Sequence, residues 1–226
     1  MGKLLSKGYA AERRAGITMD RAQSWSAGVA PSSEGADTTH LTVADGFGNV
    51  VASTQTICYL FGAGYIVPGT GMIPNNYMSS FDPHPGRANS VAPGKRVTST
   101  MSPVMVLHDG RLRYAIGLPG GLRMFPSVMQ TLSNLVDHGM SIQEAVELWT
   151  RGWGVKVEAS VPEGVLAALR DRGQDVATVN RIGCGMSAIQ FDADGTMTAP
   201  RAGGPMARRS VSAADWRGVG RGLIRI

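Results

Sequence analysis

Two threonines, Thr38 and Thr39, follow Asp37 at the point where a flexible segment enters a predicted strand. The segment before them reads GVAPSSEGA, and residues 41–56 alternate between apolar and polar around the turn DGFGN. This pattern predicts a β-hairpin whose first strand is buried on one face. The Thr38 hydroxyl is well placed to attack the Asp37 carbonyl and shift the peptide bond to an ester. Hydrolysis of that ester would leave Thr38 as a new N-terminal residue.

An N-terminal threonine can supply its own general base. Its α-amine titrates near about 7.7–8.0 and can take the proton of its own hydroxyl at neutral pH, so no separate histidine is required. His40 lies two residues from Thr38 and shares its strand face, and we interpret it as a packed residue rather than as the base. A threonine pair also suits the start of an ordinary strand, and these residues taken alone favour that structural role.

Two further segments carry groups that could contact an anion. The segment RVTSTMSP at 96–103 places the hydroxyls of Ser99 and Thr100 side by side, where they could bind a carboxylate. Gly120 and Gly121 precede a predicted helix, and glycines at a helix entry let backbone N–H groups approach an oxyanion. The alternatives are a polar turn before a strand for the first segment and an ordinary strand-to-helix turn for the second.

Composition and charge limit the class of protein. The chain has 226 residues, 43% of them hydrophobic and 17% charged, which suits a globular domain with a core. It contains neither a signal-peptide pattern nor an apolar run that could span a bilayer, so we expect no membrane partner and favour the cytoplasm. The net charge is +5, and a basic cluster near the C-terminus comprises Arg208, Arg209, Arg217, Arg221 and Arg225. No aromatic-rich motif accompanies this cluster, so we expect a solvated tail and no nucleic-acid partner.

We expect no metal and no organic cofactor. Cys58 and Cys184 are far apart and lack a CxxC spacing, which argues against both a zinc site and a disulfide framework. Asp82 and His84 lie among prolines, which makes a poor metal site. The acidic turn at 192–195 lacks the full pattern of a calcium-binding EF-hand loop, so it predicts a hairpin turn.

Periodicity and turn residues predict the remaining elements. A hairpin is expected between residues 105 and 117, and the Gly- and Pro-rich residues 61–81 predict a long loop. A capping box, Ser141-Ile142-Gln143-Glu144, opens one of the predicted helices. Helices are predicted at 3–16, 125–136, 141–149 and 163–172.

These motifs, in this order, resemble the small subunit of the γ-glutamyltransferase family, whose members are N-terminal-nucleophile hydrolases. The resemblance rests on TTH with VADGFGNVVASTQT, FGAGYIVPGTGMIPNNYMSSFDPHPG, APGKRVTSTMSP and GLPGGLRM. It runs in closely spaced blocks from about residue 37 to about residue 147, and more loosely to residue 226. It implies an α+β fold, the four-layer αββα sandwich in which two sheets face each other and helices cover their outer faces.

The resemblance also implies roles for particular residues. Thr38 would be the nucleophile after cleavage between Asp37 and Thr38, and Thr56 would hydrogen-bond and orient it. Gly120 and Gly121 would form the oxyanion hole. Ser99 and Thr100 would hold a substrate carboxylate, with Ser-Thr in place of the family's Ser-Ser pair. Residues 1–37 would be the end of the large-subunit region and the linker, and residues 38–226 the catalytic small-subunit domain.

Three positions depart from the γ-glutamyl pocket of that family. The family binds the substrate α-amino group with Asn, Gln and Asp, and this chain has Cys58, Tyr77 and Ser80 there. Replacing Asp by Ser removes the carboxylate that would form a charge-assisted contact with an ammonium group. The NNYM and DPHPGRA blocks resemble the cephalosporin-acylase-like branch, whose substrates lack that amino group.

The sequence therefore predicts an autoprocessed amide hydrolase or acyltransferase that works through an acyl-Thr38 intermediate. Its substrate would be a small γ-glutamyl or related acyl amide, with glutathione metabolism as the family's usual setting and a glutaryl-type cephalosporin acylase as the alternative. Its partner would be the large-subunit portion of the same precursor. A different class of function stays open, in which the chain is an inactive structural or binding remnant.

Overall fold

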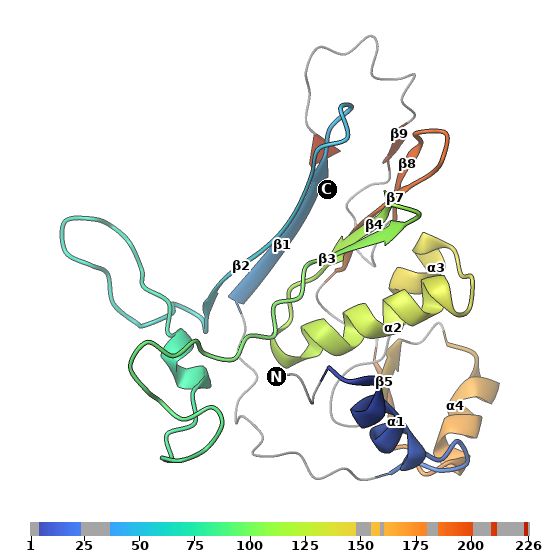
Figure 1. Cartoon of the computed structure of the whole chain (residues 1–226), viewed down its shortest axis with the longest axis horizontal. Helices are drawn as coiled ribbons and strands as arrows, with labels where there is room; N and C mark the ends of the chain where they lie inside the picture. Colours follow the sequence, from blue (N-terminus) through green and yellow to red (C-terminus); the bar gives the residue numbers. More distant parts are fainter. Residues whose placement is uncertain are drawn as a thin grey trace. The chain divides into compact units, whose positions relative to one another are not determined.

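The computed structural model describes residues 5–23, 37–147, 155–158, 161–179, 185–200, 209–211 and 224–225. The chain divides into two compact units (Figure 1). The first unit comprises Met1–Pro31 and Thr150–Ile182, and the second comprises Ser32–Trp149 and Gly183–Ile226. In the described part, no helix is long and apolar enough to cross a membrane.

The described part of the first unit contains two helices and a parallel pair of strands. Its elements are α1 (Lys7–Ala15), β5 (Val155–Glu158), α4 (Glu163–Asp171) and β6 (Val176–Val179). The hydroxyl of Ser6 caps α1 by accepting a bond from the Tyr9 N–H at 3.1 Å. Helix α4 lies between β5 and β6 in the sequence, as a parallel pair requires. Both helices were predicted from periodicity, whereas the strand pair was not.

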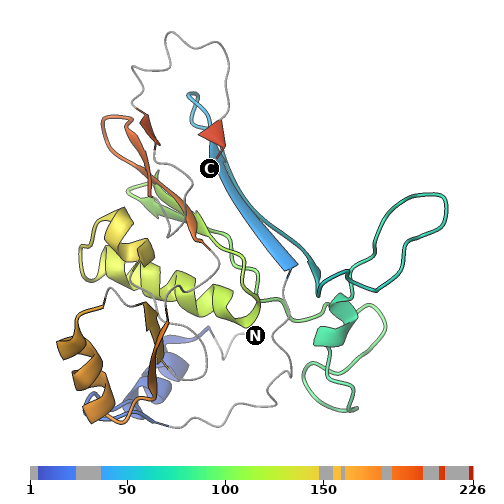
Figure 2. The same cartoon turned by 180° about the vertical axis from the view of Figure 1, so that it is seen from behind.

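The described residues of the second unit form two antiparallel sheets (Figures 1 and 2). The three-stranded sheet has the order β10-β1-β2, and its strands are β1 (Asp37–Ala44), β2 (Val50–Cys58) and β10 (Ile224–Arg225). The five-stranded sheet has the order β3-β4-β7-β8-β9. Its strands are β3 (Val104–His108), β4 (Arg111–Gly117), β7 (Ser187–Phe191), β8 (Met197–Ala199) and β9 (Arg209–Val211). The hairpins β1-β2, β3-β4 and β7-β8 agree with the sequence predictions.

The two sheets pack face to face, with β1 lying across β4 and β7. Ala44, Ile189 and Met197 form a buried cluster between them, and Val50 and Phe191 pack against this cluster. A polar contact also crosses the interface. The buried Thr42 hydroxyl donates a hydrogen bond to the Ser187 carbonyl at 3.3 Å. Apolar contact therefore holds one end of the sandwich, and polar side chains become more frequent toward the start of β1.

Helices α2 (Met124–Val136) and α3 (Ile142–Glu147) pack on the five-stranded sheet, against β4, β7 and β8. The predicted capping box is present at the start of α3, where the Ser141 hydroxyl accepts from the Glu144 N–H and the Glu144 carboxylate accepts from the Ser141 N–H. The described helix ends at Glu147, and the rest of the predicted span lies outside the described residues. Three layers therefore follow one another in the described residues: helices α2 and α3, then the five-stranded sheet, then the three-stranded sheet. These are successive layers of the predicted α+β sandwich.

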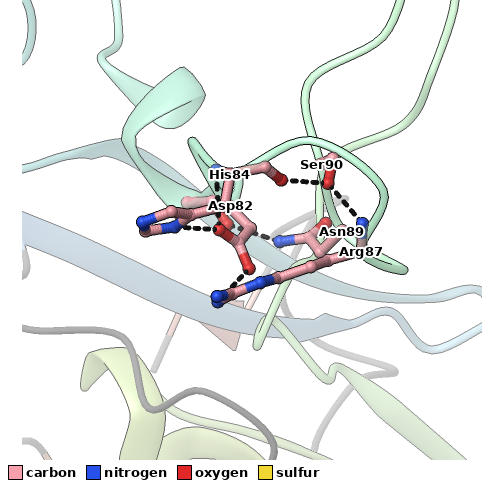
Figure 3. Close-up of polar contacts among 6 residues, drawn as sticks. Asp82, His84, Arg87, Asn89 and Ser90 are labelled. Atoms are coloured by element: carbon pink, nitrogen blue, oxygen red, sulfur yellow. Dashed lines mark hydrogen bonds and ion pairs between the residues drawn. The ribbon is translucent and has the colours of Figure 1, made fainter.

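A long connection between β2 and β3 carries the 3₁₀ helix η1 (Tyr77–Ser80) and a turn closed by Asp82 (Figure 3). Asp82 Oδ1 accepts from the His84 backbone N–H at 2.9 Å and lies 2.9 Å from His84 Nδ1. Asp82 Oδ2 accepts from Arg87 Nη1 at 3.1 Å. The Asn89 amide then donates to the Ser80 carbonyl at 2.7 Å, so the closed turn also holds the end of η1.

These contacts stabilise the carboxylate form of Asp82. The backbone hydrogen bond from His84, followed by the side-chain bonds from His84 and Arg87, holds the pKa of Asp82 below its usual value. A carboxyl whose pKa is lowered on folding contributes stability that is present above its unfolded pKa. That stability is lost as the pH falls through the lowered pKa of the folded state.

We expect Asp82→Asn to loosen the turn between residues 82 and 91, because the neutral amide cannot pair with Arg87. Hydrogen exchange read by mass spectrometry should show a lower protection factor for the His84 amide, and acidification of the parent protein should lower the same protection factor once the intrinsic rate at each pH is taken into account. The matched control is Asp109→Asn, because Asp109 is 89% exposed and lies in a turn with φ 51° that asparagine tolerates. Equal exchange in both variants would contradict the role given to Asp82.

Candidate active site

The start of β1 brings Thr38 and Thr56 into contact. The β1-β2 register places Thr38 opposite Thr56, and both side chains are half-buried on the same face of the hairpin. Thr38 Oγ1 donates a hydrogen bond to Thr56 Oγ1 at 3.0 Å, and Thr56 Oγ1 also accepts from the Cys58 N–H at 2.9 Å. The hydroxyl of Thr38 is therefore held in a defined orientation by Thr56, whereas the role of Thr38 as a nucleophile stays a prediction.

A β-bulge lies at the predicted cleavage position. Asp37 pairs with Cys58 while Thr38 pairs with Thr56, so Ile57 is the extra residue on β2 and the register shifts between Asp37 and Thr38. Cys58 has φ 78°, a left-handed conformation that is uncommon outside glycine. Bulges of this kind re-aim side chains and often occur beside active sites. Alternation of residue types predicted the hairpin, but no feature of the sequence indicated the bulge.

His40 is packed between the sheets, in agreement with the sequence interpretation. Its Nδ1 lies 2.7 Å from Thr54 Oγ1 and its Nε2 lies 3.1 Å from Thr42 Oγ1. Burial lowers the pKa of the His40 imidazole from its usual value, which favours the neutral ring. The ring also fills the space beside Gly117, where a Cβ would overlap it.

The glycine pair follows β4, because Gly120 comes three residues after the last residue of that strand and Gly121 opens η2 (Gly121–Arg123), which leads into α2. Gly120 has φ 143° and Gly121 has φ 62°, and both values favour glycine over residues with a side chain. β4 reaches β1 at the contact between Gly117 and His40. From there the chain continues toward the Thr38 end of β1, because β4 and β1 run in opposite directions along the inter-sheet space. Gly120 and Gly121 are thus placed at the same end of the sandwich as Thr38.

The direction of β4 follows from three contacts along the interface. Ala44 lies in one buried cluster with Ile189, and Thr42 bonds to the Ser187 carbonyl. Ser187 pairs with Gly117 across the β4-β7 ladder, and Ile189 pairs with Ala115. Moving from Ala44 back to the start of β1 therefore corresponds to moving forward along β4, toward the glycine pair.

Four of the five predicted substrate-binding residues lie on the β2-β3 connection, and the fifth, Cys58, is the last residue of β2. The Tyr77 hydroxyl lies 3.1 Å from Ser99 Oγ, which also accepts from the Met101 N–H at 3.2 Å. Asn76 ties η1 to the end of β2, because its N–H donates to the Ile57 carbonyl at 3.2 Å and its side-chain oxygen accepts from the Tyr59 N–H at 3.1 Å. Tyr77 is therefore anchored next to the strand end that carries Cys58. Sequence reasoning missed Asn76, since an Asn-Asn pair indicates a local turn rather than a bond to a distant strand.

Ser80 and Thr100 have other contacts among the described residues. The Ser80 carbonyl accepts from Asn89, and the Thr100 carbonyl accepts from the Ser102 hydroxyl at 3.3 Å.

Within the described residues, no three His, Cys, Asp or Glu side chains are grouped so as to hold a metal. Asp82 and His84 instead form the turn shown in Figure 3. Cys58 is a free cysteine, whereas Cys184 and three of the five arginines in the basic cluster lie outside the described residues.

Comparison with known proteins identifies the protein family of this chain. The family model described as gamma-glutamyltranspeptidase matches residues 1–215. The acylase ACY 1 proenzyme of Pseudomonas sp. (strain SE83) is 56% identical over 201 residues, which are 88% of this chain and 36% of that protein. The glutathione hydrolase proenzyme of Bacillus subtilis (strain 168) is 41% identical over 145 residues, which are 62% of this chain and 25% of that protein.

The fold agrees with these matches. The crystal structure of a cephalosporin acylase from Bacillus halodurans has a TM-score of 0.77 at 29% identity, over 93% of this chain and 39% of that one. The α+β sandwich expected from the sequence is thereby confirmed. The chain spans between a quarter and just over a third of the length of the curated relatives described above. On its sequence and its fold, the chain belongs to the gamma-glutamyltranspeptidase family of N-terminal-nucleophile hydrolases.

Proposed function

We propose that this chain is the catalytic part of an autoprocessed acyl-amide hydrolase or acyltransferase with Thr38 as its nucleophile. The observation that carries the proposal is the hydrogen bond of 3.0 Å between Thr38 and Thr56 beside the bulge at Asp37. A threonine oriented in this way at an irregular strand start can serve first as the attacking group in cleavage and then in catalysis. The proenzyme names of both relatives support this order of events.

In the cleavage step, Thr38 Oγ1 adds to the Asp37 carbonyl carbon and the C–N bond of the peptide breaks. The acyl group moves to oxygen and the nitrogen becomes the free α-amine of Thr38. Water then hydrolyses the ester, which leaves a carboxylate on Asp37 and restores the Thr38 hydroxyl. The new amine takes the hydroxyl proton in later turnovers and returns it to the leaving amine.

In turnover, Thr38 would attack an amide carbonyl and form an acyl-enzyme, which passes to water or to an amine acceptor. Gly120 and Gly121 would supply backbone N–H groups to the oxyanion, a contribution of about 3–4 kcal/mol when such a donor is well aligned. Their backbone angles and their place after β4 support this assignment. Ser99 and Thr100 would bind a carboxylate on the substrate.

The preferred substrate of this proposal is an acyl amide that lacks an α-amino group, such as a glutaryl amide. Cys58, Tyr77 and Ser80 provide no charge to pair with an ammonium group. The carboxylate nearest to Ser80 in the sequence is Asp82, and both of its oxygens are engaged by His84 and Arg87. The higher identity to the acylase than to the glutathione hydrolase supports the same substrate class.

The proposal also includes a longer precursor. Residues 1–37 would end the large-subunit region and its linker, and residues 38–226 would form the small subunit, with the upstream portion as its partner. The alternative from another class, an inactive structural or binding remnant, predicts that the precursor is not cleaved.

Intact-mass spectrometry of the complete precursor tests the nucleophile. We expect the parent to split between Asp37 and Thr38, and Thr38→Ala to remain uncleaved because it has no hydroxyl. The matched control is Thr39→Ala, because Thr39 is exposed and pairs with Gln55. This control should be cleaved as the parent is. A folded parent that never splits would leave the remnant as the better explanation.

Substrate preference is tested by restoring a carboxylate. We expect Ser80→Asp to raise kcat/KM for a γ-glutamyl anilide relative to a glutaryl anilide by about 10- to 100-fold, because a charge-assisted contact contributes about 1.5–3 kcal/mol. Ser79→Asp adds the same charge one residue away, at an exposed position, and should leave the ratio unchanged. If both variants shift the ratio equally, a general charge effect explains the change and Ser80 does not set the preference.

A further inference from the structure

The hydrogen bonds of His40 define its tautomer. Thr42 has one hydroxyl proton, and it donates this proton to the Ser187 carbonyl. Thr42 Oγ1 must therefore accept in its contact with His40 Nε2, which places the ring proton on Nε2. Nδ1 of the neutral ring is then an acceptor, and Thr54 donates to it at 2.7 Å. The imidazole thus links β1 to β2 directly and to β7 through Thr42.

Gly117 has a steric reason to be glycine. Many described glycines have positive φ and open space in the direction of a Cβ, as Gly64 and Gly110 do. Gly117 does not have a positive φ, so its backbone would accept any residue. The Cβ of such a residue would overlap Cε1, Nε2 and Nδ1 of His40. The ring of His40 and the missing side chain of Gly117 are therefore complementary in shape.

This contact lies between the two parts of the candidate active site. His40 is two residues from Thr38 on the same face of β1, and Gly117 is three residues before Gly120 on β4. Any change in the spacing of the strands at this point would alter the distance from the Thr38 hydroxyl to the glycine pair. A displacement of about 1 Å in such a geometry can lower a rate by about 100-fold.

We propose that His40 is a positioning residue for Thr38, with Gly117 as its matching partner on the opposite sheet. The ring sets the spacing between β1 and β4, and its bonds to Thr42 and Thr54 prevent it from turning. This inference rests on the proposed role of Thr38 as nucleophile, but it concerns a residue that need not contact the substrate.

A double-mutant cycle in the complete precursor tests the pairing. The variants are Gly117→Ala, His40→Ala and the combination, with Gly164→Ala as the control because Gly164 has open space around it and no positive φ. We expect Gly117→Ala to slow cleavage and lower kcat by about 10- to 100-fold, with KM changed by less than about twofold. The combined variant should be no slower than His40→Ala, because removal of the ring makes room for the added methyl group.

Conservative variants separate positioning from general stability. His40→Gln can keep a donor near Thr42 and should retain more of kcat than His40→Leu, which has a similar volume but cannot hydrogen-bond. The thermal unfolding midpoints of His40→Gln and His40→Leu should be measured as well. The order of these midpoints should differ from the order of the two kcat values. If Leu matches Gln in kcat, or if kcat simply follows the midpoint, the positioning role is wrong.

The outcomes also distinguish this inference from the proposed function. If the parent precursor is not cleaved before Thr38, the proposed function fails and the inference fails with it. If the parent is cleaved but the effects of the two substitutions simply multiply, or if Gly117→Ala behaves as Gly164→Ala does, only the inference is overturned.

Discussion

Everything at the candidate active site depends on the alternation of side chains along β1. Successive residues of a strand point to opposite faces, so alternate residues of β1 share one face, and His40, Thr42 and Ala44 on this face lie against the other sheet. The residues on this inner face are Thr38, His40, Thr42 and Ala44. Their polarity falls along the strand, from the hydroxyl of Thr38 at its start to the apolar contact of Ala44 at its end. A shift of one residue in register would turn all of them away from β4 and β7 at once.

The polar part of this face is built from groups that need no charge. Burial lowers the pKa of His40 and so favours its neutral form, and its neighbours Thr42 and Thr54 have hydroxyls that can each donate or accept. Such groups tolerate burial when they are paired, and they avoid the larger desolvation cost of an ion between the sheets. The pairing has one exception among the described residues of this interface, since Ser187 Oγ is buried without a protein partner. A water molecule bridging it to a nearby polar group would be an ordinary solution in a folded protein.

Local features of the structure could be predicted from the sequence, and distant ones could not. The β1-β2 hairpin, the Ser141 capping box and the glycines before α2 each depend on residues a few positions apart. The contact of His40 with Gly117 joins two strands that are remote in the sequence, and a glycine at a strand end gives no sign of what fills the space beside it. The β5-β6 pair was missed because its strands are short. The predicted roles of Tyr77 and Ser99 came from the family resemblance, whereas their direct contact appeared only in the structure.

The bulge at Asp37 has a consequence for what cleavage would leave behind. Of the eight residue pairs that join β1 to β2, only the pair of Asp37 with Cys58 lies upstream of the Asp37–Thr38 bond. A cut at this bond would separate Asp37 and its one pair from the hairpin and would leave the other seven pairs intact. The new amino terminus at Thr38 would therefore stay fixed in the sheet. Reversal would require the Asp37 carboxylate to be confined again beside the new amine, and the entropy cost of confining a freed chain end would oppose it.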